Sequence, residues 1–447
     1  MGDDSKFEGL SSILGVGIAI AVLLAIGVYL VATASPTKKG ITTIRWAVDP
    51  NPIRPEQIRI FRKQHPNIDV MVDSGANGQS LLTQVAGGVT PDVMALYSPE
   101  NIDFYARNNT LVDLRPYIKQ YQLPIDRLYP ALKPYVYYGD KIVGITENCG
   151  AYVLFYNKRL FREAGIPFPK ENWTWDECFA AAQKLTKYQQ VNGRQLPRQK
   201  GLYVANSDWW FFIWMYDGHL FSHDGKRCTM DSEAVKKGIR YWTDLRLKYH
   251  VLPTSSEVAS MASTGAWGGE SLLFQQEKVA MSIGGRWLSI QYRQKKDLDW
   301  DVTTVPHGSN RVTLLASKAY TIPRASHHRQ EALLFLKNAL TKENQMLIAN
   351  YGDGSPSLQS PDVIKAFMYN PDYPNEKNNG LYIREMKYAH VPEMSPYINT
   401  VDVNAVMSYE MDRVWLGQQS PDQACDNIAE RVNTIIQRNL ANPNFLD

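Results

Sequence analysis

Flat aromatic rings are the feature of this sequence best suited to chemistry, and one chemistry open to them is the recognition of a sugar. The 447 residues include eleven Trp and twenty-five Tyr. Such rings stack on the apolar faces of pyranose sugars, while Asp, Asn, Gln and Arg side chains hydrogen-bond the hydroxyls. The alternative is that the rings are ordinary core residues, because Trp and Tyr bury large apolar areas. Composition leaves both interpretations open.

Carboxylates that could hydrolyse a glycosidic bond are also present. That reaction needs two carboxylates on opposite sides of the scissile bond, and Glu147, Glu270 and Asp353 are candidates whose spacing selects no pair. A serine-nucleophile motif is missing, because Gly269, Glu270 and Ser271 lack the second glycine. A secreted glycoside hydrolase is therefore the enzyme alternative. The first hypothesis is a binding protein that breaks no bond and needs no cofactor or metal.

Charge and cysteine content narrow the class of protein. A formal net charge of +3 without a long basic run argues against a nucleic-acid partner. The length allows two or three domains, and 44% apolar with 21% charged residues is ordinary for a globular protein. Cys149, Cys178, Cys228 and Cys425 have no CxxC or metal-ligand spacing, so their pairing stays open.

Residues 1–40 predict an N-terminal membrane anchor or signal segment followed by a linker. Residues 10–34 carry no charge and are long enough to cross a bilayer as a helix. A cleaved signal peptide is the alternative, with Ala32, Thr33 and Ala34 as its cleavage motif. The apolar part is longer than in most signal peptides, and the preceding residues are acidic. We favour an uncleaved anchor in the cytoplasmic membrane, with the folded part outside the cytoplasm.

A parallel sheet is predicted at the start of the folded part. Strands at 41–48, 67–72 and 91–96 alternate with helices at 55–65 and 81–86. Ligands bind outside the carboxyl ends of such strands. The residues predicted there, as one wall of a cleft, are Trp46, Asp49, Asn77, Gln79 and Tyr97.

Two strands separated by a polar break are predicted in the middle of the chain. The strands cover 141–145 and 151–156, and the break covers 146–148. Thr174 and Glu177 predict a capping box at the start of a later helix.

Further signals follow towards the carboxyl end. Residues 189–200 predict a polar loop, and residues 279–283 predict a strand followed by glycines. Trp210 and Trp214 are four residues apart and share one face of a predicted helix.

Two segments carry a resemblance to a known family. The first contains Y-x-L-x-Y-N-K-x-L-F-x-E-A-G at residues 152–165 and T-W-D-E at 174–177, and the second contains A-M-x-I-x-G-x-W at 280–287. Both resemble the family 1 extracellular solute-binding proteins, the receptors of ATP-binding-cassette (ABC) importers for sugars. The similarity extends over residues 41–439.

The resemblance implies an α/β two-lobe periplasmic-binding-protein fold of the Venus-flytrap type, with three hinge crossings, preceded by one N-terminal hydrophobic helix. Lobe 1 would comprise residues 41–147 and 317–352, and lobe 2 residues 148–316 and 353–447. Trp287 would stack beneath the sugar, and Arg286 would hydrogen-bond a hydroxyl or an acidic group. The cleft residues that the resemblance adds are Glu147, Asn148, Asp208, Trp209, Trp267, Arg286, Trp287, Tyr351 and Asp353.

The function implied is delivery of a mono- or oligosaccharide to the permease subunits of an ABC importer. Hinge closure around the ligand would signal its capture, and the receptor is expected to be monomeric. A non-sugar polar solute such as a glycerol phosphate is an alternative, and so is a sensing role next to a membrane kinase.

Overall fold

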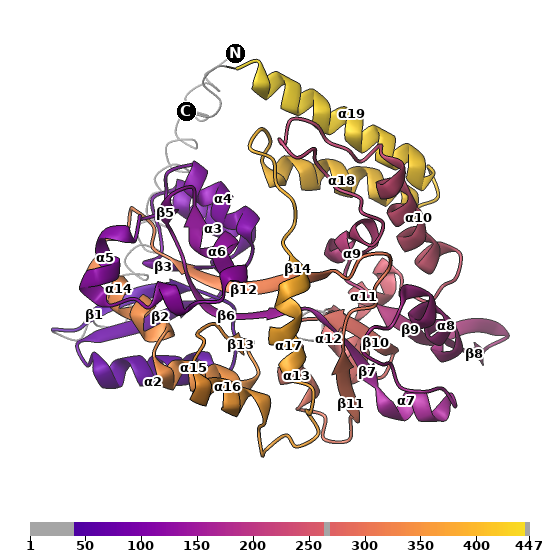
Figure 1. Cartoon of the computed structure of the whole chain (residues 1–447), viewed down its shortest axis with the longest axis horizontal. Helices are drawn as coiled ribbons and strands as arrows, with labels where there is room; N and C mark the ends of the chain where they lie inside the picture. The colour runs from indigo at the N-terminus through magenta and orange to yellow at the C-terminus, as the bar shows by residue number, and fades with distance from the viewer. Residues whose placement is uncertain (1–39, 263–268, 443–447) are drawn as a thin grey trace, which may run out of the picture.

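The computed structural model describes residues 40–262 and 269–442, which form two α/β lobes (Figure 1). Each lobe has its own β-sheet with helices packed on it. Within the described part of the chain, no helix has the length and apolarity needed to cross a membrane. The anchor predicted at residues 10–34 lies outside that part.

The first lobe is built on a seven-stranded sheet. Its strands are β1 (Thr42–Ala47), β2 (Ile68–Asp73), β3 (Val93–Leu96), β6 (Ile145–Ala151), β12 (Thr313–Thr321), β13 (Ser355–Pro356) and β14 (Ala389–His390). The order is β13-β6-β12-β3-β1-β2, with β14 paired to β12. β1 is parallel to β2 and β3, as predicted, whereas β12 is antiparallel to β3 and β6.

Helices and one small hairpin complete this lobe. They are α2 (Arg54–Gln64), α3 (Gly78–Ala86), α4 (Pro99–Arg107), α5 (Arg115–Tyr121), α6 (Lys133–Val136), β4 (Tyr137–Tyr138), β5 (Lys141–Ile142), α14 (Arg329–Ala339) and α15 (Lys342–Tyr351). Trp46 on β1 is completely buried and packs edge-on against Tyr320 and Phe335. The core of the lobe thus joins the first strand to segments almost 300 residues later.

The second lobe is built on a five-stranded sheet in the order β11-β7-β10-β9-β8. Its strands are β7 (Val153–Asn157), β8 (Lys187–Val191), β9 (Arg194–Tyr203), β10 (Val279–Gly284) and β11 (Trp300–Thr303). β7 is buried at every position, as its continuous apolar sequence predicts. Only Tyr152 separates β6 of the first sheet from β7 of the second, so the chain changes lobe there without a loop.

The remaining helices surround the second sheet or lie between the lobes. They are α7 (Lys158–Glu163), α8 (Trp175–Leu185), α9 (Trp210–Trp214), α10 (Glu233–Leu247), α11 (Ser255–Ala262), α12 (Gly269–Gln275), α13 (Leu288–Tyr292), α16 (Pro361–Met368), α17 (Gly380–Arg384), α18 (Thr400–Trp415) and α19 (Pro421–Leu440). Helices α18 and α19 pack on each other, and α19 also packs on α10 (Figure 1).

Two local predictions are wrong. The polar break at 146–148 lies inside β6, whose seven residues are all buried, because Glu147 has buried cationic partners that make a charged strand residue tolerable. The polar loop at 189–200 is instead an antiparallel hairpin of β8 and β9. Polarity misleads here because β8 is mostly exposed or partly exposed where its burial is described.

Other local predictions are confirmed. The capping box at Thr174 and Glu177 is present in both directions, and β10 covers the predicted strand at 279–283. The four cysteines, whose pairing the sequence left open, are free thiols in the buried interior.

Removing the capping hydroxyl should destabilise the protein. We expect Thr174→Ala to lower the free energy of unfolding by about 1 kcal/mol, because the backbone N–H of Glu177 loses its acceptor. The matched control is Ser360→Ala, since Ser360 precedes α16 without a side-chain capping bond. Urea unfolding of both variants measures the difference. Equal effects would contradict the prediction.

Candidate functional site

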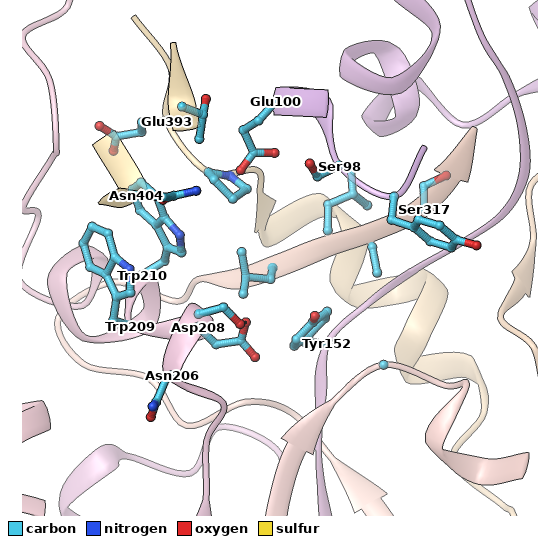
Figure 2. Close-up of a pocket in the computed structure, with 18 of the residues that line it drawn as sticks. Ser98, Glu100, Tyr152, Asn206, Asp208, Trp209, Trp210, Ser317, Glu393 and Asn404 are labelled. Atoms are coloured by element: carbon cyan, nitrogen blue, oxygen red, sulfur yellow. The ribbon is translucent and has the colours of Figure 1, made fainter. Parts of the chain in front are cut away.

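A cavity of about 770 Å³ opens between the lobes (Figure 2). The first lobe contributes Tyr97, Ser98 and Glu100 from the carboxyl end of β3 and the start of α4. The second lobe contributes Asp208 and Trp209, just before α9. A volume of this size accommodates a small-molecule ligand, and it lies at the carboxyl edge of the parallel strands, where the sequence pattern predicts a site.

Stacked indole rings form one wall of the cavity. The ring centroids of Trp209 and Trp210 are 4.2 Å apart at 21°, and those of Trp210 and Trp214 are 5.3 Å apart at 29°. Trp210 and Trp214 share one helical face, as the spacing predicts. Trp209 and Trp210 line the cavity beside Asp208 (Figure 2). The second lobe therefore presents a pre-formed aromatic wall next to a carboxylate.

Trp287 forms a second aromatic surface in the same cavity. Its ring meets Tyr152 edge-on, with centroids 5.4 Å apart. Gly285 makes this position possible, because a Cβ there would lie 1.8 Å from the Trp287 ring. Gly285, directly after β10, thus leaves room for the indole at the start of α13.

Five charged groups meet at the floor of the cavity, and all but the partly exposed Asp49 are buried. The Lys318 Nζ lies 2.7 Å from a Glu147 oxygen and 3.0 Å from an Asp353 oxygen. The Arg54 guanidinium lies 2.8 Å from an Asp49 oxygen and 3.5 to 3.6 Å from Glu147 and Asp353. We call these five residues the floor cluster. It ties together the end of β1, helix α2, strands β6 and β12, and the segment before β13.

Comparison with known proteins shows the family of this chain. Residues 48–346, well over half of the chain, match the family model of the bacterial extracellular solute-binding proteins. The chain belongs to this family. Its members are receptors that bind solutes for transport and are not enzymes, and they act outside the cytoplasm.

Individual relatives are distant but similar over most of their length. A binding protein of Brucella abortus (strain 2308) is 22% identical, over 94% of this chain and 98% of its own. The arabinooligosaccharide-binding protein of Bacillus subtilis is 23% identical over 64% of this chain and 66% of its own. An ABC substrate-binding protein from Listeria monocytogenes, solved in complex with cycloalternan, has a TM-score of 0.78 and 22% identity, over 89% of this chain and 99% of its own. That match shows the shared two-lobe fold.

The three carboxyl groups in the floor cluster of this solute-binding protein differ in how readily they hold a proton. Burial alone would raise the pKa of each carboxyl. Attraction by Lys318 and Arg54 outweighs burial at Asp49, whose pKa falls to about 2, and at Glu147, whose pKa also falls. At Asp353 burial dominates, with repulsion from Glu147 and Asp49, and the pKa lies above its ordinary value. With three carboxyls to two cations, Asp353 is the member that holds a proton most readily.

Amide side chains complete the hydrogen bonding of the floor cluster. Gln57 donates to the Glu147 carboxylate. Asn148 donates to the backbone oxygen of Asp353 over 2.6 Å, and Gln345 donates to the backbone oxygen of Glu147 over 2.8 Å. Buried charges persist only when such bonds satisfy their remaining atoms, so the cluster holds the segments in one arrangement.

Eight predicted site residues line the main cavity. They are Asp49, Tyr97, Asn148, Asp208, Trp209, Arg286, Trp287 and Asp353. Asn77 lines a neighbouring cavity of about 570 Å³, which it shares with Asp49 and Tyr97. Trp267 and the side chain of Gln79 lie outside what the structure describes.

Three predicted residues lie elsewhere. Trp46, predicted to line the cleft, lies in the core of the first lobe and reaches neither cavity, because Tyr320 and Phe335 cover its ring. Glu147 belongs to the floor cluster and has no exposed surface. Tyr351 closes α15 and accepts a bond from Arg293 through its backbone oxygen, away from both cavities.

Arg286 lines the cavity but uses its charge within the protein. It is 2% exposed, and its guanidinium donates to the backbone oxygens of Ala349 and Gly354 at 3.2 and 3.1 Å. Burial lowers its pKa to about 10. The arginine therefore joins the second lobe to the segment before β13.

Sequence reasoning missed Arg54, Lys318 and Glu100. A lysine in the apolar strand LLASKAYT is a usable signal, because a charge there requires a buried partner. Glu100 has no such signal, since an acidic residue in the first turn of a helix is common on any surface.

Breaking the floor cluster should cost much more stability than breaking a peripheral pair. We expect Lys318→Met to lower the free energy of unfolding by about 3–5 kcal/mol, because Glu147 and Asp353 lose their closest buried cation. Lys158→Met is the matched control, because Lys158 pairs with Asp299 at 2.9 Å where both are partly exposed, and it should cost under about 1 kcal/mol. Similar urea-unfolding curves for both variants would contradict this.

Proposed function

We propose that the chain is the receptor of an ABC importer and that its solute is a carbohydrate. The observation that carries this proposal is the 770 Å³ cavity in which stacked indoles stand beside carboxylate and amide groups. Ring faces match the apolar faces of a sugar, and oxygen-bearing side chains accept its hydroxyl protons. Trp209 and Trp287 would bind the rings, while Asp208 and Asn206 would bind hydroxyls.

The named ligands of related proteins support a saccharide. The Listeria protein was solved with cycloalternan, and the Bacillus relative is named for arabinooligosaccharides. Both of these ligands consist of several sugar units, so an oligosaccharide is the first candidate.

Hinge closure is the proposed mechanism of capture. The chain passes between the sheets at β6 to β7 and at β11 to β12, and it leaves the first sheet after β13 before returning to it at β14. We take the segments at β6–β7, at β11–β12 and after β13 as the three candidate hinge segments. The proposed division is residues 41–147 and 317–352 for lobe 1 and 148–316 and 353–447 for lobe 2. Its boundaries fall inside β6, inside β12 and just before β13. Rotation about these segments would bring Glu100 and Asp208 together around the ligand. The closed form would then be selected by the permease subunits, with residues 10–34 holding the receptor at the membrane.

Glycoside hydrolysis has little support at this site. Two of the candidate carboxylates, Glu147 and Asp353, lie in the floor cluster with Lys318 between them. A general acid or nucleophile must reach the glycosidic bond, and Glu147 has no exposed surface through which to do so.

A ligand screen tests the carbohydrate proposal. We expect the full-length protein to show a thermal shift with at least one member of a panel of neutral and amino mono- and oligosaccharides. A ligand at about 100 times its dissociation constant should stabilise the folded state by about 2.7 kcal/mol. The shift should be unchanged after prolonged incubation. A panel without any shift would overturn the proposal, and a shift that fades as the sugar is cleaved would indicate a hydrolase.

The aromatic wall should dominate affinity. We expect Trp209→Ala and Trp287→Ala each to weaken binding of the sugar found in that screen at least tenfold, because each removes a ring face from the cavity. Tyr369→Ala is the control, since this exposed ring lies outside the cavity. Isothermal titration calorimetry gives the affinities and circular dichroism checks folding. Unchanged affinity in a folded Trp209 variant would remove it from the site.

A further inference from the structure

The charges lining the main cavity are strongly unbalanced. The described lining residues include six carboxylates and two cations. The cations are Arg286 and Lys318; the carboxylates are Asp49, Glu100, Asp208, Asp353, Glu393 and Asp412. Lys318 and Arg54 compensate Asp49 and Asp353 within the floor cluster, so the negative excess comes from the other four carboxylates. This excess favours a cationic ligand over an anionic one.

Neither lining cation is available to a ligand. Lys318 contacts Glu147 and Asp353 within 3.0 Å. Arg286 donates to two backbone oxygens and is 2% exposed. An anionic solute such as a glycerol phosphate would have to displace one of these internal contacts, which leaves a buried carboxylate or carbonyl without its partner.

Glu100 is the carboxylate whose environment is least complete. Its Oε2 is buried and has no hydrogen-bond partner, while the carboxyl group accepts bonds from its own backbone N–H and from Ser98. Burial raises the pKa of Glu100, with repulsion from Asp103 adding to it and no cation among the causes. Figure 2 shows its side chain directed from the start of α4 into the cavity. A buried carboxylate in this state gains most from a charged donor.

The opposite wall is also suited to a cation. Asp208 comes from the second lobe and lies across the same space from Glu100 (Figure 2). Beside it, Trp209 and Trp210 form the aromatic wall, and indole rings attract cations through their π-electron density. Lobe closure would therefore bring two carboxylates and an aromatic surface around one ligand group.

We infer that the ligand carries a positively charged amine, as in an amino sugar, bound between Glu100 and Asp208 from opposite lobes. The inference rests on the proposed carbohydrate function and specifies its substrate class. A neutral sugar would offer the unpartnered Glu100 Oε2 only a hydroxyl donor. A protonated amine supplies Glu100 with a counter-charge as well as a hydrogen-bond donor, whereas a hydroxyl supplies a donor alone.

Matched pairs of sugars test the inference on the full-length protein. The pairs are glucosamine and glucose, galactosamine and galactose, and the β-1,4-linked glucosamine disaccharide and cellobiose, titrated calorimetrically at about pH 6, where an amine is largely protonated. We expect the amine of at least one pair to bind at least tenfold more tightly than its hydroxyl counterpart. Neutral sugars binding equally or better would overturn the inference but leave the carbohydrate function standing. No binding by either kind would overturn both.

A charge-removing variant then assigns the preference to Glu100. Glu100→Gln keeps an oxygen for the Ser98 hydroxyl and should reduce the amine preference at least fivefold, with a smaller effect on the neutral sugar. Asp140→Asn is the control: Asp140 belongs to the same lobe and pairs with Arg115, but it is exposed and does not line the cavity. It should leave the preference within about twofold. An amine preference that survives Glu100→Gln in a folded protein would remove Glu100 from the amine site.

Discussion

The arrangement of this protein depends on the electrostatic balance of the floor cluster. Arg54 and Lys318 neutralise carboxylates from three distant parts of the chain, and none of these charges could stay buried without the others. The cluster therefore fixes the end of β1, the middle of β6, the middle of β12 and the segment before β13 at one point. That point is also the floor of the cavity. By holding these segments in place, the cluster therefore also fixes the shape of the cavity floor.

The aromatic wall is pre-formed by a different means. Trp209, Trp210 and Trp214 stack on one another, so the ring facing the cavity is held by its neighbours and not by the ligand. Trp287 is seated by the missing side chain of Gly285. Rigid rings of this kind lose little conformational entropy on binding. The first lobe contributes mainly polar groups at the ends of strands and helices, and the second lobe contributes the apolar area.

Sequence reasoning succeeded where the signal was local. The parallel start of the sheet, the Thr174 capping box and β10 follow from periodicity, capping chemistry and β-rich composition. Family motifs pointed to Asp208 and Trp287, which line the cavity, and their role in binding stays a prediction. It failed where a residue's state depends on distant partners. Glu147 looked like part of a loop because Lys318, which makes it a strand residue, is 171 positions away. Trp46 looked like a cleft residue because its covering rings, Tyr320 and Phe335, come from segments the first strand cannot reveal.

The internal use of buried cations links the proposed hinge closure to ligand selectivity. Both cations that line the cavity, Lys318 and Arg286, hold segments of the protein together, so neither can pair with a ligand without loosening that structure. The carboxylates outnumber them, and Glu100 keeps a buried oxygen without a partner. A receptor that uses its cations for internal geometry leaves an acidic cavity. Under the proposed hinge closure this cavity would become more selective, because withdrawal of water strengthens every uncompensated charge. Uncompensated carboxylate charge would therefore disfavour closure around a ligand that lacks a positive group. The charge of an amine would favour closure.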